Sequence, residues 1–314
     1  MKEVVTIYAL LLMAVVGAAA THAQTKSPNF SIPARLENNN CSGDPTFKLT
    51  LNGMPAPVKE ELGPGSDQVI LIVLDITGDL SRIDEARQAL IADISKLPPT
   101  TWVGVLRSQD GLHVLADPTP DRQKVNDIIQ SLTSSGTPGL LETVHAALTL
   151  ADAMIRKSPV RVSVLYITDG SIYSYRENYT DPVINPSDTH DLSRRFRDAL
   201  IGEKISKLER RVSSLEAPLF VVQLDYRQNG LDQAYQNGLE ALATVTGGDA
   251  AMCHSLAEVP GVISTMLDRI KTTWRLNLAV PPRIHNSLQV GLSASCGSQD
   301  IQLAWRSHIR LKGE

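Results

Sequence analysis

Buried-strand patterns and amphipathic helix patterns alternate along residues 67–272, and this alternation restricts the fold more than any other feature of the sequence. Residues 69–74 are apolar at every position, as expected of a strand covered on both faces of a parallel sheet. Apolar residues then recur at steps of three and four from Ile83 to Leu97, which indicates a helix that ends before Pro98. Both patterns recur downstream, with strands expected at 102–106, 112–115, 161–168 and 219–224 and helices at 125–132, 141–155, 231–245 and 256–272.

This order of elements predicts an α/β fold with a doubly wound, mostly parallel sheet. One antiparallel strand is expected from the hairpin at 101–115, which turns at Asp110 and Gly111. Sheets of this kind carry their functional sites at the carboxyl ends of the strands. The residues directly after the expected strands are therefore the first candidates for a functional site.

The segments that flank residues 67–272 alternate apolar and polar residues with period two, which is typical of half-exposed strands. Such strands are expected at 47–51, 274–278, 288–292 and 301–305. Neither flank alone has enough strands to bury a face, so 46–66 and 273–314 are predicted to form one small β module. Residues 24–45 are mostly polar, and we expect a mobile leader there.

The amino-terminal residues have the composition of an export signal. Lys2 precedes an apolar run from Val4 to Ala20, and the small residues Thr21 and Ala23 fit cleavage after residue 23. We expect residues 1–23 to be removed and the protein to be exported, either to the periplasm or as a secreted protein. No second long apolar run follows, so no transmembrane segment is expected in the mature chain.

The chain contains three cysteines, Cys41, Cys253 and Cys296. Exported proteins experience oxidising conditions that favour disulfides. Cys41 and Cys296 both lie in the flanking segments and are the expected pair, whereas Cys253 follows an apolar run and is expected to be a small buried side chain. Three free thiols are the alternative.

The connection between Gly170 and Ala217 is much longer than is usual between two elements of an α/β fold. The first part of this 171–217 insertion is rich in Tyr and Asn and indicates a loop, whereas the second part has apolar residues at helical spacing. Two interpretations follow, a surface helix packed on the domain or a partner-binding or lid element over the site.

The side chains that suggest chemistry lie at the ends of two expected strands and in one loop. Asp75 directly follows the first buried strand, and its carboxylate and the hydroxyl of Thr77 can share a hard divalent cation. Thr137 lies in a loop before a helix, and Asp169 follows another buried strand at the same edge of the expected sheet. A set of carboxylates and hydroxyls suits Mg²⁺ or Mn²⁺ better than zinc. The alternative is that both carboxylates only cap helices and loops.

These motifs resemble the von Willebrand factor A-like fold over residues 67–272. The strand followed by Asp-x-Thr, the Gly-Thr-Pro loop and the strand that ends in Thr-Asp-Gly match the order and spacing of that family's metal-ion-dependent adhesion site. The resemblance implies that Asp75, Thr77, Thr137 and Asp169 bind Mg²⁺ or Mn²⁺. The family has a serine where this chain has Asp79. The Asp79 carboxylate would either act as an additional metal ligand or reduce the positive charge that the ion presents to a partner's acidic group.

The flanking segments resemble those of exported, acidobacterial-type proteins related to von Willebrand factor A. This resemblance implies a non-enzymatic binding or adhesion protein whose partner is a protein or matrix ligand, bound through an acidic group. The alternative non-enzymatic role is a structural scaffold of the envelope, in which the β module assembles the protein and the metal is incidental. A nucleic-acid partner is not expected, because the net charge is −4 and no basic stripe is present.

One enzyme class is a rival. Residues 75–80, Asp-Ile-Thr-Gly-Asp-Leu, also resemble the nucleophile loop of haloacid-dehalogenase-like phosphotransferases, in which Asp75 would form an aspartyl phosphate. The family has a lysine where this chain has Ile76, and the second Mg²⁺-binding motif of that family is missing. No Gly-x-Ser-x-Gly or Gly-x-Gly-x-x-Gly motif is present either, so the sequence favours a protein without catalytic residues or an organic cofactor.

Overall fold

The computed structural model describes residues 29–37, 43–171, 197–280 and 287–311. A central six-stranded sheet has the order β10-β9-β8-β5-β6-β7. Its strands are β5 (Gln68–Asp75), β6 (Thr101–Arg107), β7 (His113–Thr119), β8 (Arg161–Thr168), β9 (Leu219–Gln223) and β10 (Asp249–Met252). All neighbours pair in parallel except β6 and β7, which are antiparallel. The predicted doubly wound, mostly parallel α/β sheet with one antiparallel hairpin is confirmed.

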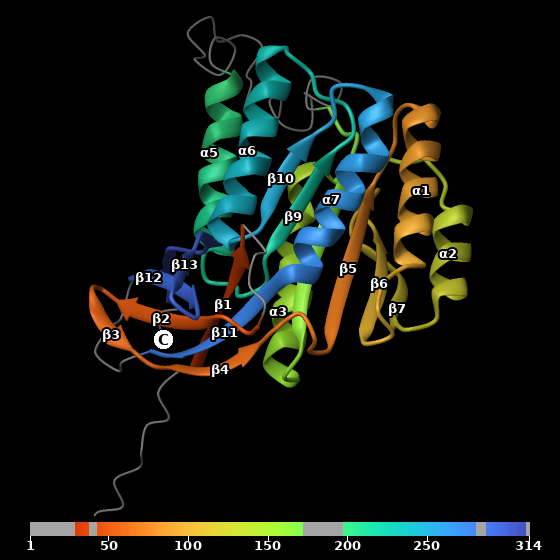
Figure 1. The fold of residues 1–314 in the computed structure, drawn as a ribbon. Helices are drawn as coiled ribbons and strands as arrows, with labels where there is room; N and C mark the ends of the chain where they lie inside the picture. Colours follow the sequence, from red (N-terminus) through yellow and green to blue (C-terminus); the bar gives the residue numbers. More distant parts are fainter. Residues whose placement is uncertain (1–28, 38–42, 172–196, 281–286, 312–314) are drawn as a thin grey trace, which may run out of the picture.

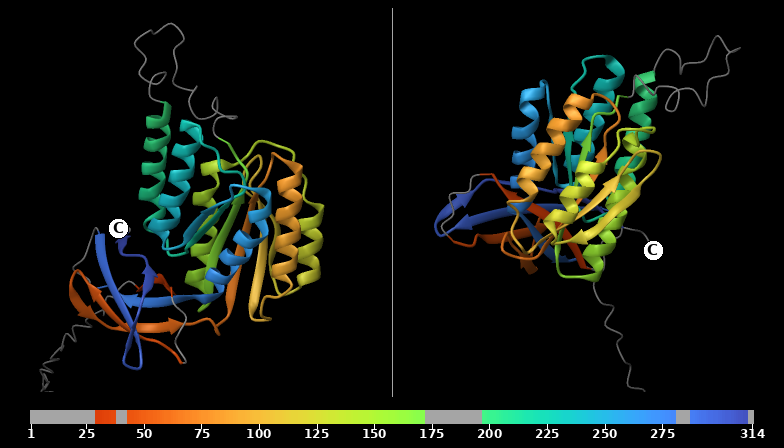
Figure 2. Two further views of the ribbon diagram at one scale, coloured as in Figure 1. Left: turned by 45° about the horizontal axis from the view of Figure 1, so that its top comes forward. Right: turned by 90° about the vertical axis from the view of Figure 1, so that its right-hand side faces the viewer.

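Helices cover both faces of this sheet (Figures 1 and 2). One face packs against α1 (Leu80–Ile94), α2 (Arg122–Ser131) and α7 (Val259–Thr272). The other packs against α3 (Val144–Lys157), α5 (Arg197–Val212) and α6 (Gly230–Thr246). The short 3₁₀ helices η1 (Leu140–Glu142) and η3 (Leu256–Glu258) precede α3 and α7. Strand β5 contributes Ile70 and Ile72 to the first face and Leu71 and Val73 to the second, which explains its unbroken apolar sequence.

The remaining described strands form a β module with two sheets around a core of their own. The first sheet has the order β14-β1-β11-β4, with β14 (Leu303–Trp305), β1 (Asn29–Leu36), β11 (Thr273–Ala279) and β4 (Val58–Leu62). The second has the order β13-β12-β2-β3, with β13 (Gln299–Ile301), β12 (Ser287–Cys296), β2 (Thr46–Leu51) and β3 (Met54–Ala56), and β15 (His308–Arg310) also pairs with β12. Strands from the two chain ends therefore pair directly. The β2–β3 turn has positive φ at Asn52 and Gly53, as a tight hairpin requires.

The expectation of a mobile leader over 24–45 is wrong for residues 29–36. They form β1, which lies between β11 and β14 and buries Phe30, Ile32 and Ala34 on alternate positions. Pro33 interrupts the pattern in the sequence, and the strands that pair with β1 lie at the other end of the chain. Residues 1–23, with the proposed export signal, lie outside the described residues. No helix in the described part of the chain is both long enough and apolar enough to cross a membrane.

The described part of the 171–217 insertion is a packed helix. Helix α5 lies beside α6 (Figure 1), and its Ile201, Ile205, Leu208 and Val212 are buried in the core of that face. The structure therefore supports the surface-helix interpretation for 197–212, while 172–196 lie outside the described residues. Of the cysteines, Cys253 is free and buried, Cys296 is disulfide-bonded, and its expected partner Cys41 is not among the described residues.

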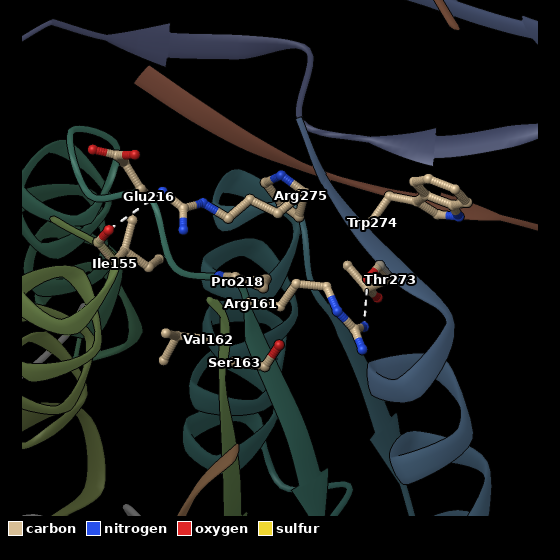
Figure 3. A pocket seen from close by; sticks show the side chains of 10 residues that line it. Ile155, Arg161, Val162, Ser163, Glu216, Pro218, Thr273, Trp274 and Arg275 are labelled. Atoms are coloured by element: carbon tan, nitrogen blue, oxygen red, sulfur yellow. Dashed lines mark hydrogen bonds between the residues drawn. The ribbon is translucent and has the colours of Figure 1, made fainter. Parts of the chain in front are cut away.

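Arg161 and Arg275 join the β module to the amino end of the central sheet. The Arg161 guanidinium donates to the carbonyls of Lys271, Thr273, Pro64 and Ser66, which are the two places where the chain passes between the domain and the module. Arg275 of β11 donates in the other direction, to the carbonyl of Val160 at 2.6 Å and to that of Ile155 at 3.3 Å. Figure 3 shows Arg275 beside Ile155. The cavity between the two arginines has a volume of ≈10 Å³, which leaves room for about one water.

Candidate metal site at the carboxyl edge of the sheet

Asp75 and Asp169 lie at the carboxyl edge of the central sheet, at the opposite end from the β module. Asp75 ends β5 and is paired in register with Thr168, the last residue of the adjacent strand β8. The backbone N–H of Asp169 donates to the carbonyl of Asp75 at 3.3 Å. The two carboxylates therefore belong to neighbouring strands of one edge, although they are far apart in the sequence.

The Asp75 side chain is completely buried and accepts hydrogen bonds from several protein groups. Its Oδ1 accepts the Gly139 N–H at 2.7 Å, and its Oδ2 accepts the Leu140 N–H at 2.9 Å, the Tyr166 hydroxyl at 2.9 Å and the Thr168 hydroxyl at 3.3 Å. Burial raises the pKa of Asp75, and the hydrogen bonds from Gly139, Tyr166 and Leu140 oppose this rise. Asp75 thereby anchors the loop that leads into η1.

Asp169 anchors the loop after β5 in the same way, by accepting hydrogen bonds from its backbone. Its Oδ1 accepts the Thr77 N–H at 2.9 Å and its Oδ2 accepts the Gly78 N–H at 2.6 Å. A side chain at position 78 would be crowded, because its Cβ would lie 2.7 Å from Asp169 Oδ2. Burial raises the pKa of Asp169, and the two backbone hydrogen bonds lower it. Proximity to Asp169 also raises the pKa of Asp75, so the two anions repel each other.

The other three residues expected at the site are in different environments. Thr77 is half-buried next to the Asp169 carboxylate. Asp79 is the N-cap of α1: its exposed carboxylate accepts the Ser81 N–H at 2.9 Å and lies 3.8 Å from Arg82. The negative charge of Asp79 therefore stabilises the amino terminus of α1.

Thr137 lies in an exposed loop that is tied to the turn between β6 and β7. The N–H of Thr137 donates to Asp110 Oδ1 at 2.9 Å, and the Asp110 N–H donates back to the Thr137 carbonyl at 2.9 Å. Gly136, directly before it, has φ of 112°, which only glycine adopts easily. The loop position of Thr137 is thus set by Gly136 and Asp110.

The sequence analysis did not predict a cluster of buried hydroxyls beside Asp75. Tyr166, in the middle of β8, has its hydroxyl 3.1 Å from Ser108 Oγ and 3.2 Å from Thr143 Oγ1, and these two oxygens are 2.5 Å apart. All three side chains are buried. The sequence feature that could have predicted this cluster is Tyr166, because a phenol hydroxyl in an otherwise apolar buried strand needs a hydrogen-bond partner.

The donor chemistry at this edge fits a hard divalent cation. Two repelling carboxylates and nearby hydroxyls are the ligands that Mg²⁺ uses, and a cation would offset the cost of burying both charges. From the residues that the structure describes, Asp75 Oδ1 accepts one hydrogen bond, so it retains acceptor capacity. In the described part of the chain no group of three or more His, Cys, Asp and Glu side chains is placed to hold a metal, so hydroxyl and water oxygens would have to complete the coordination.

Comparison with known proteins identifies a domain type for this part of the chain. Residues 70–171 match the family profile of the von Willebrand factor type A domain. This segment contains all five residues expected at the metal site. No curated protein matches the chain.

Several solved structures are similar. A von Willebrand factor type A protein from Catenulispora acidiphila has 11% identity and a TM-score of 0.45, over 92% of this chain and 74% of that one. The von Willebrand factor domain of the type V pili tip protein Mfa5 from Porphyromonas gingivalis has 14% identity and a TM-score of 0.43, over 65% and 95%. The ArnB paralog VWA2 from Sulfolobus acidocaldarius has 11% identity and a TM-score of 0.42, over 91% and 76%.

Proposed function

We propose that this chain is an exported, non-enzymatic binding protein of the von Willebrand factor A-related type. It holds Mg²⁺ or Mn²⁺ at the carboxyl edge of the central sheet and binds a protein or matrix ligand there. The observation that carries this proposal is the pair Asp75 and Asp169, two buried carboxylates at the neighbouring ends of β5 and β8, where the charge of Asp169 raises the pKa of Asp75. The family match over residues 70–171 supports a role in protein binding.

Asp75, Thr77, Thr137 and Asp169 are the residues that would hold the cation, and Asp79 is an additional candidate that already caps α1. A bound cation would supply an electrophilic contact for an acidic group of the ligand. The chain's own contribution is to fix the surrounding loops. Asp169 holds the backbone of Thr77 and Gly78, and Asp75 holds the backbone of Gly139 and Leu140, so the loop that carries Thr77 is anchored to β8 and the one that follows Thr137 to β5.

The first test is isothermal calorimetry of the metal-free protein with Mg²⁺ and Mn²⁺. We expect saturable binding that is lost in Asp75→Asn and Asp169→Asn. Asp152→Asn is the matched control, because Asp152 is also a buried carboxylate that accepts a backbone N–H, that of Glu216, and it lies outside the proposed site. A wild-type protein without saturable binding contradicts the metal site and favours the envelope scaffold.

The second test addresses the partner. The protein should retain ligands from an envelope extract in the presence of Mg²⁺ and release them when EDTA is added. A ligand set that is identical with and without EDTA shows that binding does not depend on the cation. Export is tested separately, by locating the full-length protein in cell fractions and by determining whether its amino terminus begins at residue 24.

A further inference from the structure

We infer that Tyr166 is a positioning residue for the cation site, acting through Asp75. Its buried hydroxyl fixes one carboxylate oxygen of Asp75 and leaves the other to bind the cation. This inference rests on the proposed function, and it assigns a role to a cluster that the metal-binding motif does not include. The cluster consists of Tyr166, Ser108 and Thr143 and is called the hydroxyl cluster below.

The contacts of Tyr166 place it between three elements. Its hydroxyl is 2.9 Å from Asp75 Oδ2 at the end of β5, 2.8 Å from the Leu140 carbonyl in η1, and within 3.2 Å of Thr143 at the start of α3. A phenol has a single proton to donate, and the Asp75 carboxylate is the stronger acceptor because it is charged. The hydroxyls of Ser108 and Thr143 are then placed to donate to the phenol oxygen.

The two oxygens of Asp75 are used unequally. Oδ2 accepts from Leu140, Tyr166 and Thr168, which exceeds the two lone pairs of a carboxylate oxygen. Within the described ranges, Oδ1 accepts from Gly139 alone. Oδ1 therefore has more acceptor capacity left for a cation than Oδ2, and the hydrogen bond from Tyr166 to Oδ2 helps to fix the carboxylate in this orientation.

Replacing Tyr166 with Phe removes this hydrogen bond and retains the aromatic ring in the core. The Asp75 carboxylate loses one of the bonds that fix its rotation, and the hydroxyl cluster loses its link to the carboxylate. Residues that orient a metal ligand in this way typically change metal affinity by about 10- to 100-fold when they are removed. We expect Tyr166→Phe to weaken Mg²⁺ and Mn²⁺ binding by a factor in that range.

The experiment is a Mn²⁺ titration followed by electron paramagnetic resonance, with calorimetry for Mg²⁺, on the wild-type protein, Tyr166→Phe and Tyr235→Phe. Tyr235 is a second completely buried tyrosine in the same core, so Tyr235→Phe controls for the loss of a buried hydroxyl. Thr143→Val removes the next hydroxyl of the cluster and should weaken binding by a smaller factor. A near-ultraviolet tyrosine difference spectrum on cation binding should appear in the wild type and in Tyr235→Phe but not in Tyr166→Phe.

The outcomes separate this inference from the proposed function. A wild-type protein that binds no cation overturns the metal site and the role of Tyr166 together. A wild-type protein that binds the cation, with equal affinity and an unchanged difference spectrum in Tyr166→Phe, overturns only the role of Tyr166. An equal loss of affinity in Tyr166→Phe and Tyr235→Phe also overturns it, because the effect would then be one of general packing.

Discussion

Replacing Arg161 with Met is expected to destabilise the protein strongly, because Arg161 joins the α/β domain to the β module. The side chain is only 4% exposed. It donates to Lys271 and Thr273, where α7 passes into β11, and to Pro64 and Ser66, where β4 passes into β5. Burial lowers the pKa of Arg161 to about 10, so the guanidinium remains charged at neutral pH. Met fills much of the volume of the arginine stem but satisfies none of these carbonyls.

The magnitude follows from the number of acceptors and their burial. A net hydrogen bond to a charged group contributes about 1.5–3 kcal/mol, so four such bonds sum to roughly 6–12 kcal/mol. Removing the guanidinium also relieves the cost of burying its charge, which is several kcal/mol. Water can reach the three partly buried carbonyls but not the buried one at Thr273. We therefore expect a net loss of about 3–5 kcal/mol in the free energy of unfolding.

Urea unfolding followed by circular dichroism measures this loss. Lys96→Met is the control, because Lys96 pairs with Asp93 on the surface and should contribute no more than about 1 kcal/mol. Arg161→Lys should fall between the two, since an ammonium group has three donors and lacks the planar fork that serves four carbonyls. A loss below about 1 kcal/mol for Arg161→Met would refute the argument that this arginine secures the junction.

Two further predictions concern Asp79 and Cys253. Asp79→Ala should lower the free energy of unfolding by about 1 kcal/mol because the α1 cap is lost, whereas Asp79→Asn should leave it nearly unchanged. Thermal unfolding measures both variants. An equal loss in both would contradict a capping role for Asp79. If Asp79→Asn also keeps the wild-type Mg²⁺ affinity, Asp79 is not a metal ligand. Burial raises the pKa of the Cys253 thiol to about 11, so at neutral pH the native protein should resist alkylation by iodoacetamide and the urea-unfolded protein should react, as measured by mass spectrometry. Rapid alkylation of Cys253 in the native state would contradict its burial.

The arrangement of the central sheet was predictable because each of its elements has a local signature. Residues 69–74 are apolar throughout, and the helix after them has the period of an amphipathic helix, so neither depends on knowledge of a distant partner. Strand β1 was missed for the opposite reason. Its alternation of Phe30, Ile32 and Ala34 is short and contains Pro33, and it forms a strand only because β11 and β14 pair with it.

The two carboxylates of the site were predictable from the local sequence, whereas the hydroxyl cluster was not. Asp75 and Asp169 follow buried strands, and the edge they share is a consequence of parallel pairing. The hydroxyl cluster could not be derived in this way, because Ser108, Thr143 and Tyr166 come from three different elements that meet only in the folded protein. Asp79 was interpreted through its place in the metal-binding motif, whereas its position before α1 gives it a capping function that any helix start favours.

Loop anchoring and cation binding both require the carboxylates of Asp75 and Asp169, yet they differ in how stability responds to Mg²⁺. Anchoring alone needs a side chain that accepts one N–H on each of its two terminal atoms. A carboxylate does this, but an amide presents one oxygen and one NH₂ donor, so Asp169→Asn should destabilise the protein even without metal. Cation binding adds an increment that grows with Mg²⁺ concentration, because a ligand that binds only the folded state stabilises it by mass action. The unfolding midpoint of the wild type should therefore rise with added Mg²⁺, and that of Asp169→Asn should start lower and stay constant. The slope against Mg²⁺ concentration, rather than the loss of stability, is the quantity that assigns this edge of the sheet to a metal.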